Sequence, residues 1–312
     1  MTAFAFVFPG QGSQSVGMLD AWGDHPAVLQ TLAEAAEALH EDVAQLIHAG
    51  PREALELTTN TQPVMLTAAI ACYRAWRAEG GSEPAAVAGH SLGEYSALVA
   101  AGALTLVDAL PLVRFRAQAM QQAVPVGAGA MAAILGLDAA QVQQVCATVA
   151  MQTGELVAPA NYNDPKQTVI AGSKAGVNAA CDAAKTAGAK RALLLAVSAP
   201  FHSSLMKPAA EVLRERLQGV RITAPHIPVV NNVDVAVNTD PADIRDALVR
   251  QAYGAVRWVE VTQALRARGL VHIVECGPGR VLAGLIKRVD AEIQTTTVLD
   301  PASLKQALEM LA

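Results

Sequence analysis

The sequence has few charged or aromatic residues and no run that could cross a membrane. Of its 312 residues, 16% are charged and 4% aromatic, whereas 52% are hydrophobic. This composition is typical of a folded protein with a large core and excludes a disordered chain. No apolar run approaches the ~18 residues of a membrane span, and no basic leader precedes the short apolar run at the N-terminus. We therefore expect a cytoplasmic protein without a membrane partner.

Cysteine is scarce, and a surplus of basic residues is absent. The four cysteines at 72, 146, 181 and 276 form no C-x-x-C pair, so neither a disulfide framework nor a zinc site is indicated. Lys and Arg number 23 against 28 for Asp and Glu, which gives a net charge of −5 and argues against a general nucleic-acid binder. We expect buried free thiols in a reducing compartment, no metal and no nucleic-acid partner.

Apolar runs of strand length alternate with Ala-rich helical stretches along most of the chain. This order predicts an α/β fold in which helices cover a mostly parallel sheet. The clearest strands are expected at 4–8, 85–89, 227–233 and 271–279. The last two end in Asn or in Gly-Pro, which is typical of core strands with functional loops at their ends.

Residues 125–198 follow a different order, with Pro and Gly at the first boundary and Pro at the second. The pattern is β-α-β-β-α-β, which is the ferredoxin-like order, with elements expected at 131–137, 138–150, 156–162, 167–173, 174–188 and 191–197. Gly and Pro at the ends permit one domain to be inserted in another. We predict a small subdomain at 125–198 inserted into a large one formed by 1–124 and 199–312.

The segment A-V-A-G-H-S-L-G-E contains a G-x-S-x-G motif at the end of a predicted strand. Small residues at 89 and 93 permit a sharp turn that would lift the Ser91 hydroxyl above the edge of the sheet. An ordinary helix-capping serine takes the same position, so the motif alone leaves both interpretations open. A nucleophilic serine also needs a base, usually histidine. Among seven histidines, His202 stands out because it lies in a Pro-containing loop before a helix, although such a histidine is more often structural.

Seven motifs occur in order along the chain and together carry a family resemblance. They are F-P-G-Q-G-S-Q (8–14), G-H-S-L-G-E (89–94), R-x-x-x-M-Q (116–121), H-S-S-L-M-K-P-A (202–209), N-N-V-D (231–234), Q-A-Y-x-x-V-R-W (251–258) and E-C-G-P-G (275–279). From about residue 4 to 290 the chain resembles the malonyl-CoA:acyl-carrier-protein transacylases of bacterial type II fatty-acid synthesis, within the acyltransferase family.

The resemblance implies a fold, a reaction and roles for particular residues. The large subdomain would be α/β-hydrolase-like and the inserted one ferredoxin-like. Ser91 would attack the malonyl thioester of coenzyme A, His202 would take its proton, and the malonyl-serine would be discharged to the phosphopantetheine thiol of acyl carrier protein. The backbone N–H groups of Gln11 and Leu92 would form the oxyanion hole. A main-chain carbonyl at Gln251 would orient the histidine in place of an acidic triad partner.

Malonate carries a free carboxylate, and arginine offers a planar, bidentate partner for it. The helical stretch 105–123 contains two candidates, Arg114 and Arg116. Helical spacing places Arg116 on the apolar face with Met120 and without an acidic neighbour, although a surface arginine would fit the spacing as well. The resemblance selects Arg116 as the malonate partner, with Met120 beside it. It also assigns Phe201 to the acyl pocket, where many stand-alone bacterial members carry Ser.

Three other functions remain compatible with parts of the sequence. A serine thioesterase or esterase would share the nucleophile but would require an acidic triad partner. A docking scaffold would have no use for the site residues, and a trans-acting loader of a polyketide synthase would share the entire pocket. We expect a monomer with no bound cofactor, which takes a coenzyme A thioester as substrate. An acidic carrier protein would need a local basic patch, for which the candidates are Lys190 with Arg191 and Lys287 with Arg288.

Overall fold

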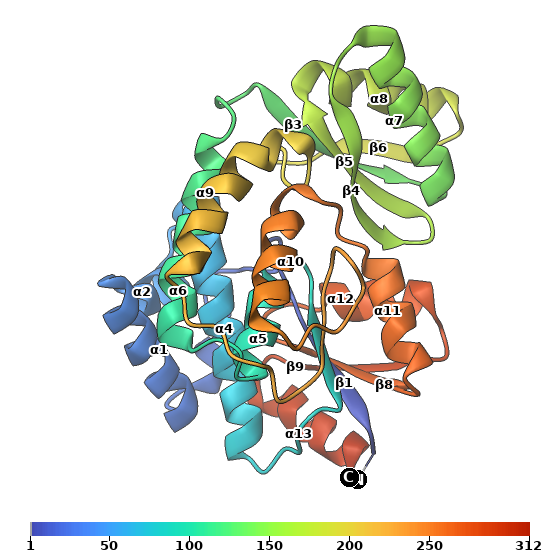
Figure 1. Cartoon of the computed structure of the whole chain (residues 1–312). Helices are drawn as coiled ribbons and strands as arrows, with labels where there is room; N and C mark the ends of the chain where they lie inside the picture. Colours follow the sequence, from blue (N-terminus) through green and yellow to red (C-terminus); the bar gives the residue numbers. More distant parts are fainter. Residues whose placement is uncertain (1) are drawn as a thin grey trace.

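The computed structural model describes residues 2–312 and contains two separate β-sheets with helices packed against them (Figure 1). The strands are β1 (Phe4–Phe8), β2 (Ala86–Gly89), β3 (Gly129–Leu135), β4 (Val157–Asp164), β5 (Gln167–Ser173), β6 (Arg191–Leu194), β7 (Val229–Val230), β8 (His272–Cys276) and β9 (Gln294–Val298). The helices are α1 (Pro26–Leu39), α2 (Val43–Ala49), α3 (Arg52–Glu56), α4 (Thr58–Ala78), α5 (Gly93–Ala100), α6 (Leu106–Gln122), α7 (Ala139–Thr153), α8 (Lys174–Thr186), α9 (Lys207–Gln218), α10 (Pro241–Tyr253), α11 (Trp258–Ala267), α12 (Val281–Val289) and α13 (Pro301–Leu311), with short 3₁₀ turns η1 (Asp20–Trp22) and η2 (Ser204–Met206). Within residues 2–312, no helix is both long and apolar enough to cross a membrane.

The larger sheet has the strand order β7-β2-β1-β8-β9, and all of its neighbouring strands are parallel. The central strand β1 is buried along its whole length, as its unbroken apolar run predicts. Its phenylalanines face helix α4, where the rings of Phe6 and Trp76 lie 5.4 Å apart, edge to face. Ala5 and Val7 point to the opposite side, into the cluster that contains Trp258 of α11. Two hydrophobic cores therefore hold the strand that ends at the candidate site.

The smaller sheet is antiparallel, with the order β4-β5-β3-β6. Its strands and the helices α7 and α8 follow the β-α-β-β-α-β order that the sequence predicted, and apolar side chains of both helices pack against the strands in a core of their own. A parallel sheet with a separate antiparallel sheet confirms the predicted α/β fold class. The division of the chain after residues 124 and 198 stays a prediction.

Several strands differ from the sequence prediction in length or in existence. The predicted strand at 227–233 is reduced to Val229–Val230, and the one at 191–197 ends at Leu194. Strand β9 was not predicted, because its sequence QTTTV is rich in threonine and lacks an apolar run. It pairs with β8 at the edge of the larger sheet, where β-branched threonine suits a half-buried strand.

Strand β4 attaches the smaller sheet to the larger part of the molecule. The amide of Tyr162 donates to the carbonyl of Val256, and the amide of Val256 donates to the carbonyl of Ala160, each at 2.9 Å. At the end of the strand, the buried carboxylate of Asp164 accepts a hydrogen bond from Arg288 Nε of α12 at 2.6 Å. These contacts fix the smaller sheet beside the carboxyl ends of β1 and β2.

The four cysteines are buried free thiols, as the sequence predicted. Burial raises the pKa of the Cys72 and Cys146 thiols to about 12. A thiol with so high a pKa stays protonated and is a poor nucleophile. The cysteines therefore serve as core residues.

Candidate active site

Ser91 lies on a sharp turn between the end of β2 and the start of α5. Its backbone has φ of 52°, a conformation that a non-glycine residue adopts only under constraint. A Cβ atom on Gly89 would lie 1.9 Å from the backbone of Gly93, and one on Gly93 would lie 2.0 Å from the carbonyl oxygen of Phe8. The two glycines of the motif are thus required by close backbone contacts around the serine.

We expect Gly93→Ala to destabilise the protein by about 2–3 kcal/mol, because the added methyl group meets backbone atoms that no rotamer change can move. Denaturant unfolding measures this loss. Gly219→Ala is the matched control, since a Cβ there would meet its nearest atom at 3.7 Å. We expect that control to change stability by no more than about 0.5 kcal/mol. Equal effects of the two substitutions would contradict the steric explanation.

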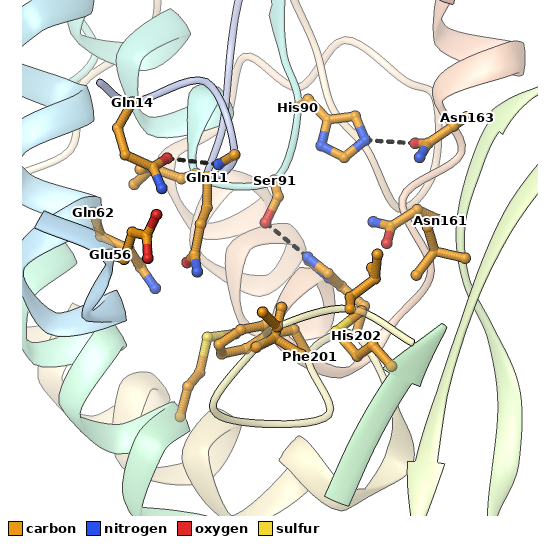
Figure 2. A pocket seen from close by; sticks show the side chains of 18 of the residues that line it. Gln11, Gln14, Glu56, Gln62, His90, Ser91, Asn161, Asn163, Phe201 and His202 are labelled. Atoms are coloured by element: carbon orange, nitrogen blue, oxygen red, sulfur yellow. Dashed lines mark hydrogen bonds between the residues drawn. The ribbon is translucent and has the colours of Figure 1, made fainter. Parts of the chain in front are cut away.

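His202 lies in the loop that precedes η2, and its ring points at Ser91 (Figure 2). The distance from Ser91 Oγ to His202 Nε2 is 2.7 Å. The other ring nitrogen, Nδ1, lies 2.9 Å from the carbonyl oxygen of Gln251 and 3.2 Å from that of Gly254, at the C-terminal end of α10. These carbonyls require a proton on Nδ1, which leaves Nε2 free to accept the hydrogen bond of the serine hydroxyl.

The pKa of His202 falls to about 3, first because the ring is buried and then because the Arg116 guanidinium is nearby. The imidazole is therefore neutral at physiological pH. Within residues 2–312, no carboxylate lies within 4 Å of this ring. The buried carboxylate of Asp164, at the end of β4, binds Arg288 and is not a partner of this ring.

The backbone amides of Gln11 and Leu92 lie on the two turns that follow β1 and β2. Both residues line the pocket around Ser91, and no hydrogen bond from either amide is found within residues 2–312. The side chain of Gln11 accepts a hydrogen bond from Thr58 Oγ1 at 2.8 Å, which holds its turn against α4. Two such amides are available to a developing oxyanion, and their role in an oxyanion hole stays a prediction.

Arg116 of α6 is 2% exposed, so the sequence-based choice of the inward face agrees with its position. Nη1 donates to Gln62 Oε1 at 2.7 Å, and Nη2 donates to Gln251 Oε1 at 2.9 Å and to Ser91 Oγ at 3.3 Å. The guanidinium also lies over the ring of Tyr95, at 5.4 Å from its centroid. Its partners are neutral amides and a hydroxyl, which leaves the positive charge without a contacting carboxylate in the described chain.

A pocket of about 540 Å³ opens in front of these groups. Met120 and Phe201, the other predicted substrate-binding residues, both line it and are nearly buried. The smaller sheet forms a further wall, to which β4 contributes Asn161 and Asn163 (Figure 2). His90 points away from the serine and its Nε2 lies 2.8 Å from Asn163 Oδ1, which ties the serine turn to β4. All eight predicted site residues therefore surround one pocket or contact a residue that lines it.

Sequence reasoning did not assign roles to several polar residues of the site. Gln62 lies in a helix without a motif, and Glu94 and Asn232 belong to motifs that were used only for the resemblance. Asn232 carried a signal, as a polar residue at the end of a predicted strand, whereas Gln62 and Glu94 lie in helices and carried none. Their partners could not be inferred because those lie as far as 157 positions away in the chain.

The chain matches a known protein family over nearly its whole length. A family described as the acyl transferase domain matches residues 5–301. The malonyl CoA-acyl carrier protein transacylase of Escherichia coli is 51% identical over 99% of this chain and 100% of its own length. This chain belongs to the acyl transferase family. Another relative of this acyl transferase, a protein of the same name in Bacillus subtilis, is 47% identical over 100% of this chain and 98% of its own.

Solved structures resemble this acyl transferase over the whole chain. The acyl-carrier-protein S-malonyltransferase of Burkholderia pseudomallei is 63% identical, with a TM-score of 0.97 over 99% of this chain and 100% of that one. A malonyl-transacylase in complex with its type II PKS acyl-carrier protein is 49% identical, with a TM-score of 0.97 over 99% and 100% of the two chains. These solved structures therefore share the overall fold of this acyl transferase, including both sheets.

Proposed function

We propose that this acyl transferase moves the malonyl group of malonyl-CoA to the phosphopantetheine thiol of acyl carrier protein and so supplies fatty-acid elongation. The observation that carries this proposal is the buried guanidinium of Arg116, 3.3 Å from Ser91 Oγ in the same pocket. A cation without a contacting carboxylate beside a nucleophile suits an acyl group that has its own free carboxylate. The names of the relatives point to the same substrates.

The reaction proceeds in two halves through a malonyl-serine. In the first, Ser91 Oγ attacks the thioester carbonyl carbon while His202 Nε2 takes the hydroxyl proton. The amides of Gln11 and Leu92 hold the oxyanion, and as the C–S bond breaks the histidine returns its proton to the coenzyme A sulfur. In the second, the carrier-protein thiol gives its proton to His202 and attacks the serine ester, and the proton then returns to Ser91 Oγ.

The carbonyl partners of His202 favour a transferase over a serine hydrolase. A hydrolase of this fold class uses an acidic residue to stabilise the charged imidazole. Main-chain carbonyls orient the ring with less stabilisation of its charge. A weaker base suffices for a thioester, because a thiolate leaves more readily than an alkoxide. We propose a monomeric enzyme in which Met120 and Phe201 shape the acyl pocket.

The test is acyl transfer from a panel of acyl-CoA thioesters to purified holo carrier proteins of fatty-acid and polyketide type. We expect malonyl-CoA to be the preferred donor and the fatty-acid carrier the preferred acceptor, with one malonyl group gained per carrier. Hydrolysis of malonyl-CoA without loading of any carrier would indicate a thioesterase. A clear preference for the polyketide carrier would replace the proposed pathway but leave the chemistry unchanged.

We expect the carrier protein to dock against Lys190 and Arg191, which are exposed at the start of β6. Charge reversal at both should weaken carrier affinity at low salt, because docking of an acidic partner is driven by local charge. Reversal at Lys287 is the matched comparison, since its neighbour Arg288 is engaged by Asp164. The half-saturation concentration of the carrier measures the effect. An unchanged value for both variants would place the docking surface elsewhere.

A further inference from the structure

Glu94, in the first turn of α5, is a buried carboxyl group to which the reaction above assigns no role. Its side chain is 2% exposed, and within residues 2–312 no basic nitrogen lies within 4 Å of it. Its Oε2 accepts hydrogen bonds from the amide of Asn232 at 2.8 Å and from Gln251 Nε2 at 3.0 Å. Burial of a carboxyl group without a cation is unfavourable unless hydrogen bonds compensate for it. The role of Glu94 therefore depends on what its two partners, Asn232 and Gln251, hold in place.

Asn232 holds the serine turn from both ends. Its Oδ1 accepts a hydrogen bond from the amide of Ser91 at 2.7 Å, and its Nδ2 donates to the carbonyl of Gly89 at 2.7 Å. Ser91 adopts a disfavoured backbone conformation, and such a conformation persists only where its surroundings constrain it. Because Glu94 fixes the backbone of Asn232, it supports this constraint on the nucleophile.

Gln251 is the second partner of Glu94 and contacts three groups of the site. Its Nε2 donates to the carbonyl of Ser91 at 2.9 Å, and its Oε1 accepts from Arg116 Nη2 at 2.9 Å. Its main-chain carbonyl accepts the hydrogen bond of His202 Nδ1 at 2.9 Å. A shift of this one residue would therefore move the nucleophile, the base and the guanidinium together.

We propose that Glu94 is a positioning residue, which acts as a hydrogen-bond acceptor for Asn232 and Gln251 and thereby fixes Ser91, His202 and Arg116 relative to one another. The inference rests on the proposed function, because the groups that it aligns are those of malonyl transfer. The side chain of Glu94 does not need a negative charge to accept these two hydrogen bonds. Burial raises the pKa of Glu94 to about 7, and Oε2 can accept in either protonation state.

The variants Glu94→Ala and Glu94→Gln distinguish the contribution of the hydrogen-bond acceptor from that of the negative charge, because alanine removes both and glutamine removes only the charge. Rapid mixing with malonyl-CoA gives a rate constant for malonyl-enzyme formation and an amplitude that reports the fraction of folded protein. We expect Glu94→Ala to lower the rate constant about 100-fold, the size of a small misplacement of reacting groups. Glutamine keeps an acceptor oxygen and should restore the rate constant to within about three-fold of wild type.

Glu275 provides the matched control, because it is another fully buried carboxyl group with a pKa raised by burial, to about 6. Its Oε2 accepts from the amide of Ala283 in α12, and within residues 2–312 no hydrogen bond joins its side chain to a site residue. We expect Glu275→Ala to lower the melting temperature and the amplitude while the rate constant stays as in wild type. A wild-type rate constant for Glu94→Ala, or a Glu94→Gln variant as slow as the alanine variant, would overturn the proposal.

A second measurement separates this inference from the proposed function. Phenylmethylsulfonyl fluoride sulfonylates an activated serine hydroxyl with release of fluoride, and it needs no malonyl group. We expect the labelling rate of Ser91 to fall in Glu94→Ala and to recover in Glu94→Gln. If wild type forms no malonyl-enzyme but labelling follows this pattern, the substrate proposal fails and the positioning role stands. Equal labelling of all three proteins would contradict the positioning role.

Discussion

Replacement of His202 by alanine is expected to slow malonyl loading of Ser91 roughly 10³-fold, which is the size of a general-base contribution. The reason is that His202 Nε2 lies 2.7 Å from Ser91 Oγ and is placed to take its proton. The neighbouring side chains offer no second base to replace it. His40→Ala is a suitable control, because His40 has a similar left-handed backbone, with φ of 52° against 58° for His202. That variant should load at the wild-type rate. Similar losses in the two variants would point to backbone strain in place of catalysis.

The pKa of His202 adds a pH signature to this prediction. Its folded value is about 3 and its ordinary value is 6.5, so the base is neutral and active throughout this interval. The loading rate should therefore show no inflection near 6.5, in contrast to a solvent-exposed histidine base. The same depressed pKa makes the stability of the folded protein depend on pH. The unfolded chain takes up a proton below 6.5 that the folded protein refuses, so stability is full above 6.5 and falls as the pH drops toward 3.

Thermal unfolding at a series of pH values checks the same linkage. The His202→Ala variant lacks the group that titrates, so its melting temperature should fall less than that of wild type between about pH 7 and pH 5. Parallel curves for the two proteins, or an inflection of the wild-type loading rate near the ordinary value of 6.5, would contradict the depressed pKa.

Replacement of Arg116 by alanine is expected to reduce malonyl loading about 100-fold or more. Each charge-assisted hydrogen bond to the substrate carboxylate contributes about 1.5–3 kcal/mol, and the guanidinium can offer at least a pair. Acetyl-CoA has no such carboxylate, so its loading should change little and the malonyl preference should disappear. The ratio of the two loading rates is the quantity to measure, because it cancels any loss of folded protein.

Arg114 is the matched control for this substitution, because it lies on the same helix and contacts different groups. Its Nη1 donates to Asn60 Oδ1 at 2.8 Å, and its Nη2 contacts the carboxylate of Glu41. Arg114→Ala should therefore keep the malonyl preference. An unchanged preference in Arg116→Ala would remove the basis for a malonate site in this pocket.

The sequence predicted the parts of the fold that depend on local pattern. The all-apolar run of β1 and the alternation of strands and helices in residues 129–194 each predict a type of element with little dependence on distant contacts. Strand β9 and the shortening of β7 depend on which neighbour supplies hydrogen bonds, and no local pattern reports that. The threonines of β9 form a strand because β8 lies beside them and pairs with them.

The residues of the candidate site that lie in recognisable sequence motifs could be predicted. Local spacing marked Ser91 and Arg116 as candidates but left another interpretation open for each, and a loop position marked His202. The resemblance then selected these three residues and added Gln11. The amide network of Gln62, Gln251 and Asn232 could not be predicted, since glutamine and asparagine carry no charge or periodicity that marks them. The expected absence of an acidic neighbour of Arg116 on its helix left its partners open, and these are neutral amides that leave its charge available.

Intact-protein mass after mixing with malonyl-CoA alone tests the central claim most directly. We predict that the protein gains the mass of one malonyl group, that peptide mapping places it on Ser91, and that addition of holo carrier protein removes it as the carrier gains the same mass. Ser91→Ala should gain nothing. Free malonate and coenzyme A beside an unmodified protein, or an adduct on any other residue, would contradict transfer through a malonyl-serine.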